Sequence, residues 1–89
     1  MAALDLLGRR WSLRVLWELR NGPVGARALR DRCDAMSPSV LYQRLADLTD
    51  AGLVAQGDDQ QYELTEIGRA LGAALEPLDR WSRHWAQQL

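Results

Sequence analysis

The sequence predicts a mostly α fold of the α+β class, and three patterns carry this prediction. Four segments have the apolar spacing of helices, one short segment has the pattern of a β-hairpin, and the C-terminal stretch is long and amphipathic. Apolar residues make up 47% of the 89 residues, which is enough for a hydrophobic core. We expect one domain spanning residues 1–89, because a chain of this length is the size of a single small domain.

The first two predicted helices are apolar. Residues 2–7 favour a short helix that ends at Gly8. Residues 11–20 follow, and their polar side chains form only a narrow stripe, which is typical of a helix in the middle of a fold. The run Asn21-Gly22-Pro23 should end this helix, because glycine and proline commonly follow a helix C-terminus.

The next two predicted helices are short and close together along the chain. Residues 26–33 favour a helix rich in arginine. Ser37 and Pro38 predict the start of another helix, because a serine N-cap before a proline is a strong start signal. This helix should run to Ala51. Its expected buried face consists of Leu41, Leu45 and Leu48. Two such helices, joined by a connection of three or so residues, are typical of a helix-turn-helix.

A short two-stranded wing and a long helix complete the prediction. Residues 53–56 and 61–64 flank a turn-forming stretch and favour a hairpin. Thr65 should cap a last helix that runs nearly to Leu89. Its apolar stripe consists of Ile67, Leu71, Ala74, Leu78, Trp81 and Trp85. The sequence therefore predicts a winged helix-turn-helix with a long C-terminal helix.

The long C-terminal helix is expected to serve for dimerisation. At ~1.5 Å per residue it is longer than so small a domain can cover, and Pro77 should kink it. Aromatic residues are enriched at the centres of interfaces, and two tryptophans lie on the uncovered stripe. A homodimer is therefore predicted. Its expected interface residues are Leu4, Leu7, Leu71, Leu78, Trp81 and Trp85.

Four stretches of the sequence carry a resemblance to a known family. They are residues 3–8 followed by Trp11, residues 21–23, residues 37–45 followed by 48 and 51–54, and residues 62–69. In this order and at these spacings they resemble the HxlR-type winged helix-turn-helix transcription regulators, relatives of the MarR group. The resemblance covers almost the whole chain. It implies a transcription regulator that binds a pseudo-palindromic operator as a homodimer, through a recognition helix at about residues 37–51.

The sequence also departs from this family pattern. Family members usually carry a cysteine ahead of the first helix, and in some it senses oxidants. The single Cys33 lies elsewhere, so redox sensing does not carry over. Ser39 stands where the family favours a basic residue, and Ala26 stands where it favours an aromatic one. Asp58 and Asp59 occupy the wing, where Arg or Lys is usual.

This resemblance makes the helix at residues 37–51 the candidate recognition helix, and its N-terminal half would contact the bases. With the leucines buried, helical spacing points Ser39, Gln43 and Ala46 outward. Gln43 can pair with adenine, and Arg44 can reach guanine or a phosphate. Arg27, with its neighbouring arginines, can neutralise a phosphate. The residues expected to bind double-stranded DNA are Ser37, Pro38, Ser39, Tyr42, Gln43, Arg44 and Arg27.

The charge of the chain leaves a second hypothesis about its function open. The net charge is -1, and the excess of arginine lies mainly in residues 1–34. Asp47 and Asp50 lie further along the outward helix face and should repel phosphate. A second hypothesis is therefore a winged-helix protein-interaction or antirepressor module that no longer binds DNA.

Other classes of function find little support. One histidine and one cysteine make no recognisable metal site, and neither a glycine-rich phosphate loop nor a nucleophile motif occurs. We expect no cofactor and no enzyme activity. The sequence shows no signal peptide and no apolar run long enough to span a membrane, so a cytoplasmic location is expected. A small-molecule effector stays an open question, because no convergent polar cluster points to one.

Overall fold

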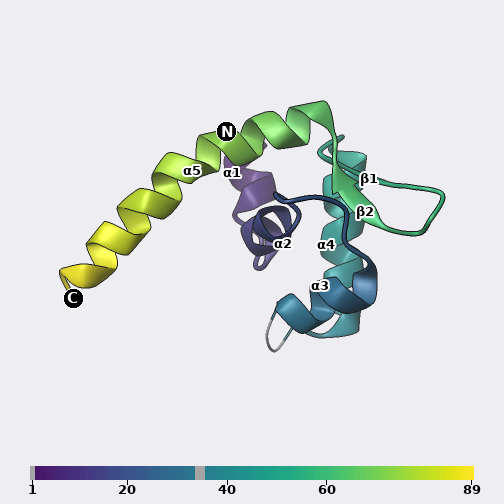
Figure 1. The fold of residues 1–89 in the computed structure, drawn as a ribbon, viewed down its shortest axis with the longest axis horizontal. Helices are drawn as coiled ribbons and strands as arrows, with labels where there is room; N and C mark the ends of the chain where they lie inside the picture. Colours follow the sequence, from purple (N-terminus) through teal and green to yellow (C-terminus); the bar gives the residue numbers. More distant parts are fainter. Residues whose placement is uncertain (1, 34–35) are drawn as a thin grey trace.

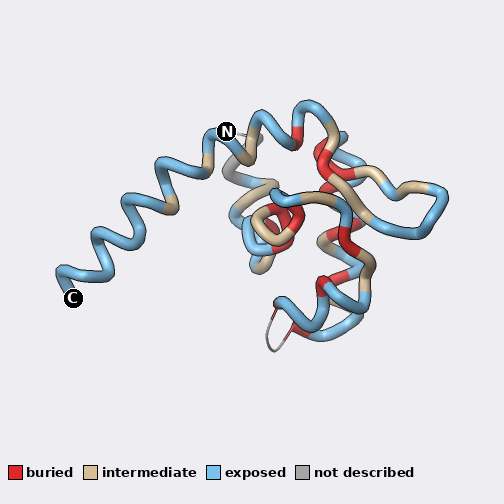
Figure 2. The backbone as a smooth tube through the Cα atoms, in the orientation of Figure 1, coloured by how far each residue is buried: buried red, intermediate tan, exposed pale blue. Residues whose placement is uncertain are grey.

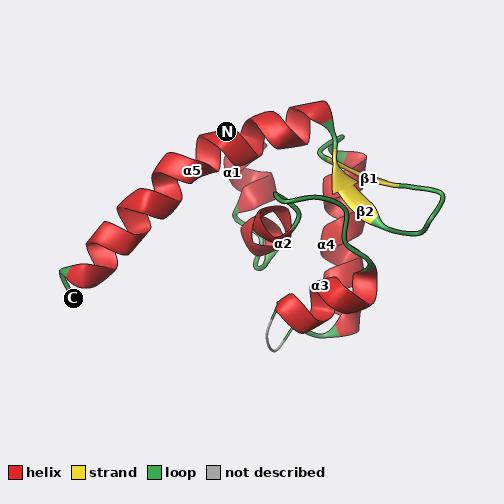
Figure 3. Cartoon of the chain, viewed as in Figure 1, coloured by secondary structure: helices red, strands yellow, loops and turns green. Residues whose placement is uncertain are grey.

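The computed structural model describes residues 2–33 and 36–89, with side chains from Asp5 onward. Over these residues it contains five α-helices and one two-stranded antiparallel sheet (Figures 1 and 3). The elements are α1 (Ala2–Leu7), α2 (Ser12–Glu18), α3 (Ala26–Arg32), α4 (Pro38–Asp50), β1 (Val54–Gln56), β2 (Tyr62–Leu64) and α5 (Glu66–Gln87). The predicted winged helix-turn-helix with a long C-terminal helix is confirmed.

Two side-chain caps set the starts of the longest helices. The Ser37 hydroxyl accepts a hydrogen bond from the Val40 N–H at 3.3 Å, with Pro38 in the first turn of α4. The Thr65 hydroxyl accepts one from the Gly68 N–H at 3.1 Å at the start of α5. Each cap satisfies a backbone N–H that has no partner inside its helix. Both helix starts agree with the prediction.

Helix α2 is shorter than the predicted 11–20. Trp11 has a φ of 78°, in the left-handed region, so it precedes the helix and does not belong to it. The helix ends at Glu18. Val15, Leu16 and Leu19 are buried, as expected for a segment in the middle of the fold. Figure 2 shows the buried residues concentrated in the body formed by α2, α3, α4 and the wing.

The two helices of the helix-turn-helix are joined as predicted. Helix α3 ends with Cys33 as its C-cap and α4 begins with Ser37 as its N-cap, so three residues lie between the caps, which agrees with the expected connection of three or so residues. Cys33 and Met36 are both buried in the core, at 0% and 5% exposed. These two apolar residues attach the connection to the core.

Arg14 joins α2 to the end of α3. Its Nε donates to the Glu18 carboxylate at 2.9 Å, one helical turn further along α2. Its Nη2 also donates to the Arg32 carbonyl at 2.6 Å. Carbonyls in the last turn of a helix lack partners inside the helix, and Arg14 supplies one. The side chain therefore fastens the first helix of the helix-turn-helix to α2.

The wing is attached on both sides. Val54 pairs with Leu64 and Gln56 with Tyr62 in the antiparallel register. Tyr62 also exchanges two backbone hydrogen bonds with Val24, each at 2.9 Å. The segment before α3 therefore lies beside the wing and fixes it next to the helix-turn-helix.

Helix α5 continues unbroken through Pro77 to Gln87. Figure 1 shows it starting beside the wing, passing α1, and carrying its second half away from the rest of the molecule. Along this second half, Figure 2 shows mostly exposed residues. The helix changes direction along its length, so the proline is accommodated without ending it.

Candidate nucleic-acid interface

One face of α4 is buried and the opposite face is exposed. Leu41, Leu45 and Leu48 are at most 1% exposed, whereas Ser39, Gln43 and Ala46 are exposed. This agrees with the direction predicted from helical spacing. Ser37 and Ser39 also lie close together at the start of the helix, with 3.3 Å between their hydroxyl oxygens. The exposed face therefore begins at a capped helix N-terminus, which is an arrangement that attracts anions.

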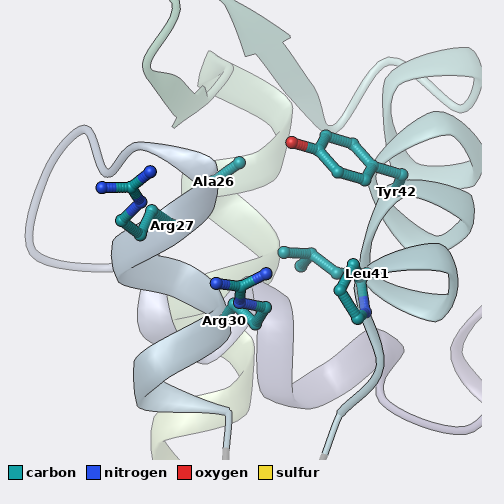
Figure 4. Close-up of a pocket in the computed structure, with 6 residues that line it drawn as sticks. Ala26, Arg27, Arg30, Leu41 and Tyr42 are labelled. Atoms are coloured by element: carbon teal, nitrogen blue, oxygen red, sulfur yellow. The ribbon is translucent and has the colours of Figure 1, made fainter.

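A hollow of about 170 Å³ separates α3 from α4 beside this exposed face (Figure 4). The residues that line it are Ala26, Arg27, Arg30, Pro38, Leu41 and Tyr42. The Tyr42 ring extends from α4 toward Ala26 with its hydroxyl leading. Because alanine is small, the space beyond that hydroxyl stays open.

Two cationic side chains border this hollow. Arg27 and Arg30 are both exposed and both come from α3. Within the described residues, neither makes a hydrogen bond or an ion pair through its side chain. Guanidinium groups and a phenol around one opening are suited to an oxyanion such as phosphate.

Asp47 is bound to other side chains, contrary to the expected repulsion of phosphate. Its Oδ1 accepts a hydrogen bond from Gln43 Nε2 at 3.0 Å. Its Oδ2 lies 3.4 Å from Arg44 Nε and 3.5 Å from Arg9 Nη1. The Asp47 side chain is only 15% exposed. Its negative charge is thus compensated inside the protein, and of the two aspartates on this part of α4 only Asp50 is exposed.

Arg44 is less accessible than the prediction assumed. Its side chain is 15% exposed, and its buried Nε makes no hydrogen bond within the described residues although Asp47 is close. The Arg44 Nε thus faces Asp47, and only a small part of this side chain is open to DNA. Ser39, Tyr42 and Gln43, by contrast, are exposed.

The wing next to α4 is short and acidic. Asp58 and Asp59 are exposed at its tip, and Asp59 Oδ1 accepts a hydrogen bond from the Gln61 N–H at 3.0 Å. At its base, burial raises the pKa of the Tyr62 phenol above the ordinary value of 10, and the neighbouring Tyr42 raises it further. Tyr62 is therefore uncharged at neutral pH and can act as a hydrogen-bond donor beside Tyr42.

The predicted dimer residues lie in two regions, one formed by α1 and the start of α5 and the other on the second half of α5. Leu7 and Leu71 border an apolar hollow of about 460 Å³ between α1, the end of α4 and the start of α5. Leu78, Trp81 and Trp85 lie on the second half, where they are 49%, 57% and 50% exposed. The two indole rings stack with 5.7 Å between their centroids. Leu4 belongs to α1, but its side chain lies outside the described part of the structure.

No helix in the part of the chain that the structure describes is long and apolar enough to cross a membrane. No group of three or more His, Cys, Asp or Glu side chains among the described residues is placed to hold a metal ion.

The fold and the exposed face of α4 define a winged helix-turn-helix protein, a class in which the second helix of the motif reads DNA. Residues 6–89 match the family model described as HxlR-like helix-turn-helix. The chain belongs to this family of DNA-binding transcription regulators. Among curated proteins, it is 30% identical over 90 residues to YkvN of Bacillus subtilis, an uncharacterised HTH-type transcriptional regulator, and the match covers 94% of this chain and 76% of that protein.

Solved structures show the same relationship. A possible HxlR family transcriptional factor from Thermoplasma volcanium is 28% identical, with a TM-score of 0.86 over 94% of this chain and 81% of that one. The quinone-bound YodB of B. subtilis is also 28% identical, with a TM-score of 0.79 over 99% of this chain and 94% of that one.

Proposed function

We propose that this chain is a homodimeric transcription regulator that reads a pseudo-palindromic operator, with α4 of each copy in one of two successive major grooves. The observation that carries the proposal is the position of the hollow between α3 and α4. It places Arg27, Arg30 and the Tyr42 hydroxyl next to the exposed face of α4. Base-reading and phosphate-binding groups then lie on one continuous surface.

Each predicted contact residue has a distinct part in this proposal. Ser37 and Pro38 fix the N-terminus of α4, and Ser39 beside them contacts a base or a phosphate. Gln43 reads adenine. Arg27 and Tyr42 hold a phosphate at the mouth of the hollow, and Arg44, whose Nε faces Asp47, reaches a base or a phosphate through the exposed part of its side chain.

The proposal is tested by titrating the purified protein with a duplex selected in vitro and with random duplex, at two or more salt concentrations. We expect tighter binding to the selected duplex and a loss of affinity as salt rises. The acidic wing and the net charge of -1 favour the alternative, a protein-interaction or antirepressor module. Absence of a preference for any duplex would support that alternative.

The acidic wing leads to a prediction about its own role. Changing both Asp58 and Asp59 to asparagine should strengthen DNA binding or leave it unchanged, because it removes charges that repel phosphate. Asparagine at position 59 keeps an oxygen that can accept from the Gln61 N–H, so the turn should be preserved. Affinity for operator and random duplex measures the effect. Weaker binding by the double variant would show that the wing contributes a contact through these carboxylates.

The exposed stripe of α5 leads to a prediction about assembly. We propose that Leu78, Trp81 and Trp85 pack against a second copy, because small monomers rarely expose such a continuous apolar surface. Trp85→Ala should weaken association by about 2 kcal/mol, as is usual for an aromatic residue central to an interface. Its unfolding temperature should then fall below that of the wild type by an amount that depends on protein concentration, because dimer and fold are linked.

Sedimentation and thermal unfolding at several concentrations measure this effect. Gln87→Ala is the control, since Gln87 is exposed and polar on the same helix. A wild-type protein that sediments as a monomer at micromolar concentration would contradict the dimer.

A further inference from the structure

Asp47 lies on α4 one helical turn beyond Gln43, the residue proposed to read a base. We propose that Asp47 is a positioning residue that fixes the orientation of the Gln43 amide and thereby gives the protein its preference for adenine over guanine. This inference rests on the proposed function. It gives Asp47 a part in reading the operator sequence, although its carboxylate was expected to oppose DNA binding. The contact that carries it is the 3.0 Å hydrogen bond from Gln43 Nε2 to Asp47 Oδ1.

The chemistry of the two groups determines which way the amide faces. A carboxylate only accepts hydrogen bonds, so it holds the nitrogen end of the amide and not the oxygen end. An amide without such a partner can turn over, which exchanges its donor and its acceptor. Gln43 Nε2 has a second hydrogen, and its Oε1 stays available, so the fixed amide still offers one donor and one acceptor.

The donor and the acceptor of the fixed Gln43 amide together discriminate between adenine and guanine. In the major groove adenine presents N7 as an acceptor and the N6 amino group as a donor, whereas guanine presents N7 and O6, both acceptors. A fixed amide matches adenine with both of its ends. Opposite guanine, its oxygen would face O6, and two acceptors repel. An amide held the other way round would mismatch adenine at both ends, with its oxygen facing N7 and its amino group facing the N6 amino group, whereas opposite guanine it would still make one matched contact.

The surroundings keep Asp47 in this position. Arg44 Nε and Arg9 Nη1 lie 3.4 Å and 3.5 Å from its second oxygen, Oδ2. Both are cations, and Arg9 comes from the connection between α1 and α2, so Asp47 is held from outside its own helix as well. The two carboxylate oxygens therefore have separate partners, with Gln43 on one and the arginines on the other.

Because the two oxygens of Asp47 have separate partners, the effect of Asp47→Asn on the Gln43 amide can be predicted. An asparagine has one oxygen, and the two arginines should draw it toward themselves, because they can only donate. Its amino group would then face Gln43 and favour the opposite orientation of that amide. We expect the preference for adenine over guanine at one position of the operator to fall by about tenfold. Binding to random duplex should not weaken, since a negative charge is removed.

The matched control is Asp50→Asn, which removes the same charge from an exposed residue of the same helix. Each variant is titrated against the selected operator and against duplexes in which single A·T pairs are replaced by G·C. Asp50→Asn should keep the wild-type preference. In the Gln43→Ala background, Asp47→Asn should cause no further loss, because the group that it positions is absent.

Several outcomes overturn the inference. If Asp47→Asn and Asp50→Asn change the preference equally, only charge matters. If Asp47→Asn still lowers the preference in the Gln43→Ala background, Asp47 acts through something other than Gln43. A wild type with no sequence preference overturns the proposed function itself, whereas a wild type that discriminates and an Asp47→Asn variant that does so equally well overturn this inference alone.

A second measurement applies if Asp47→Asn does not fold. In the wild-type protein, the hydrogens of the Gln43 side-chain amide should exchange with solvent more slowly than those of the exposed Gln87, because one of them is donated to Asp47. Equal exchange rates for the two amides would overturn the inference without any variant.

Discussion

Replacing Gly68 by alanine is expected to lower the free energy of unfolding by about 3 kcal/mol or more, the upper part of the range for overpacked sites. Gly68 is buried in the first turn of α5, where this helix crosses the start of the wing. An added Cβ would overlap the carbonyl oxygen of Leu53 and would lie 3.3 Å from Leu64 Cβ. The Leu53 carbonyl cannot easily move, because it accepts a hydrogen bond from the Thr65 N–H at 3.0 Å.

Urea unfolding of the variant and the wild type measures this loss. Gly72→Ala is the matched control, since it lies one turn along the same helix and its added Cβ would meet only Leu64 Cδ1, at 3.9 Å. In that open position alanine should stabilise the helix by roughly 0.5–1 kcal/mol. Equal destabilisation by both substitutions would contradict a local clash at Gly68.

The parts of the fold that the sequence predicts well have local causes. The starts of α4 and α5 follow from Ser37 and Thr65, whose side chains each accept from the backbone N–H three residues further on. The predicted start of α2 was wrong, because the residue type of Trp11 does not indicate that its backbone is left-handed. The need for glycine at position 68 likewise depends on the wing crossing α5, which periodicity alone does not reveal.

The candidate site likewise has features that the sequence predicts and features that only the structure reveals. Leucine spacing alone predicts the outward direction of Ser39 and Gln43. The spacing of Gln43 and Asp47, four residues apart on one helix, could also have indicated their contact. The approach of Arg9 could not be predicted, because it lies 38 residues from Asp47 along the chain. The hollow beside Tyr42 depends on how α3 packs against α4, and therefore required the structure.

Gln43→Ala and Arg27→Ala should weaken DNA binding in two distinguishable ways. Loss of a base contact typically costs ~1–3 kcal/mol and relaxes discrimination at one position of the site. Gln43→Ala should therefore lower the ratio of operator affinity to random-duplex affinity. Loss of a phosphate contact weakens all sequences alike. Arg27→Ala should lower both affinities and make the salt dependence shallower by about one unit of slope.

Titrations of each variant against operator and random duplex at several salt concentrations separate these effects. Both side chains are exposed, away from the buried leucines of α4, so the fold should survive both changes. Arg69→Ala is the charge-matched control, because Arg69 is exposed on α5 and does not line the hollow. It should leave the salt slope nearly unchanged. If Gln43→Ala binds operator as the wild type does, α4 does not read bases through this residue, and the interaction-module hypothesis gains support.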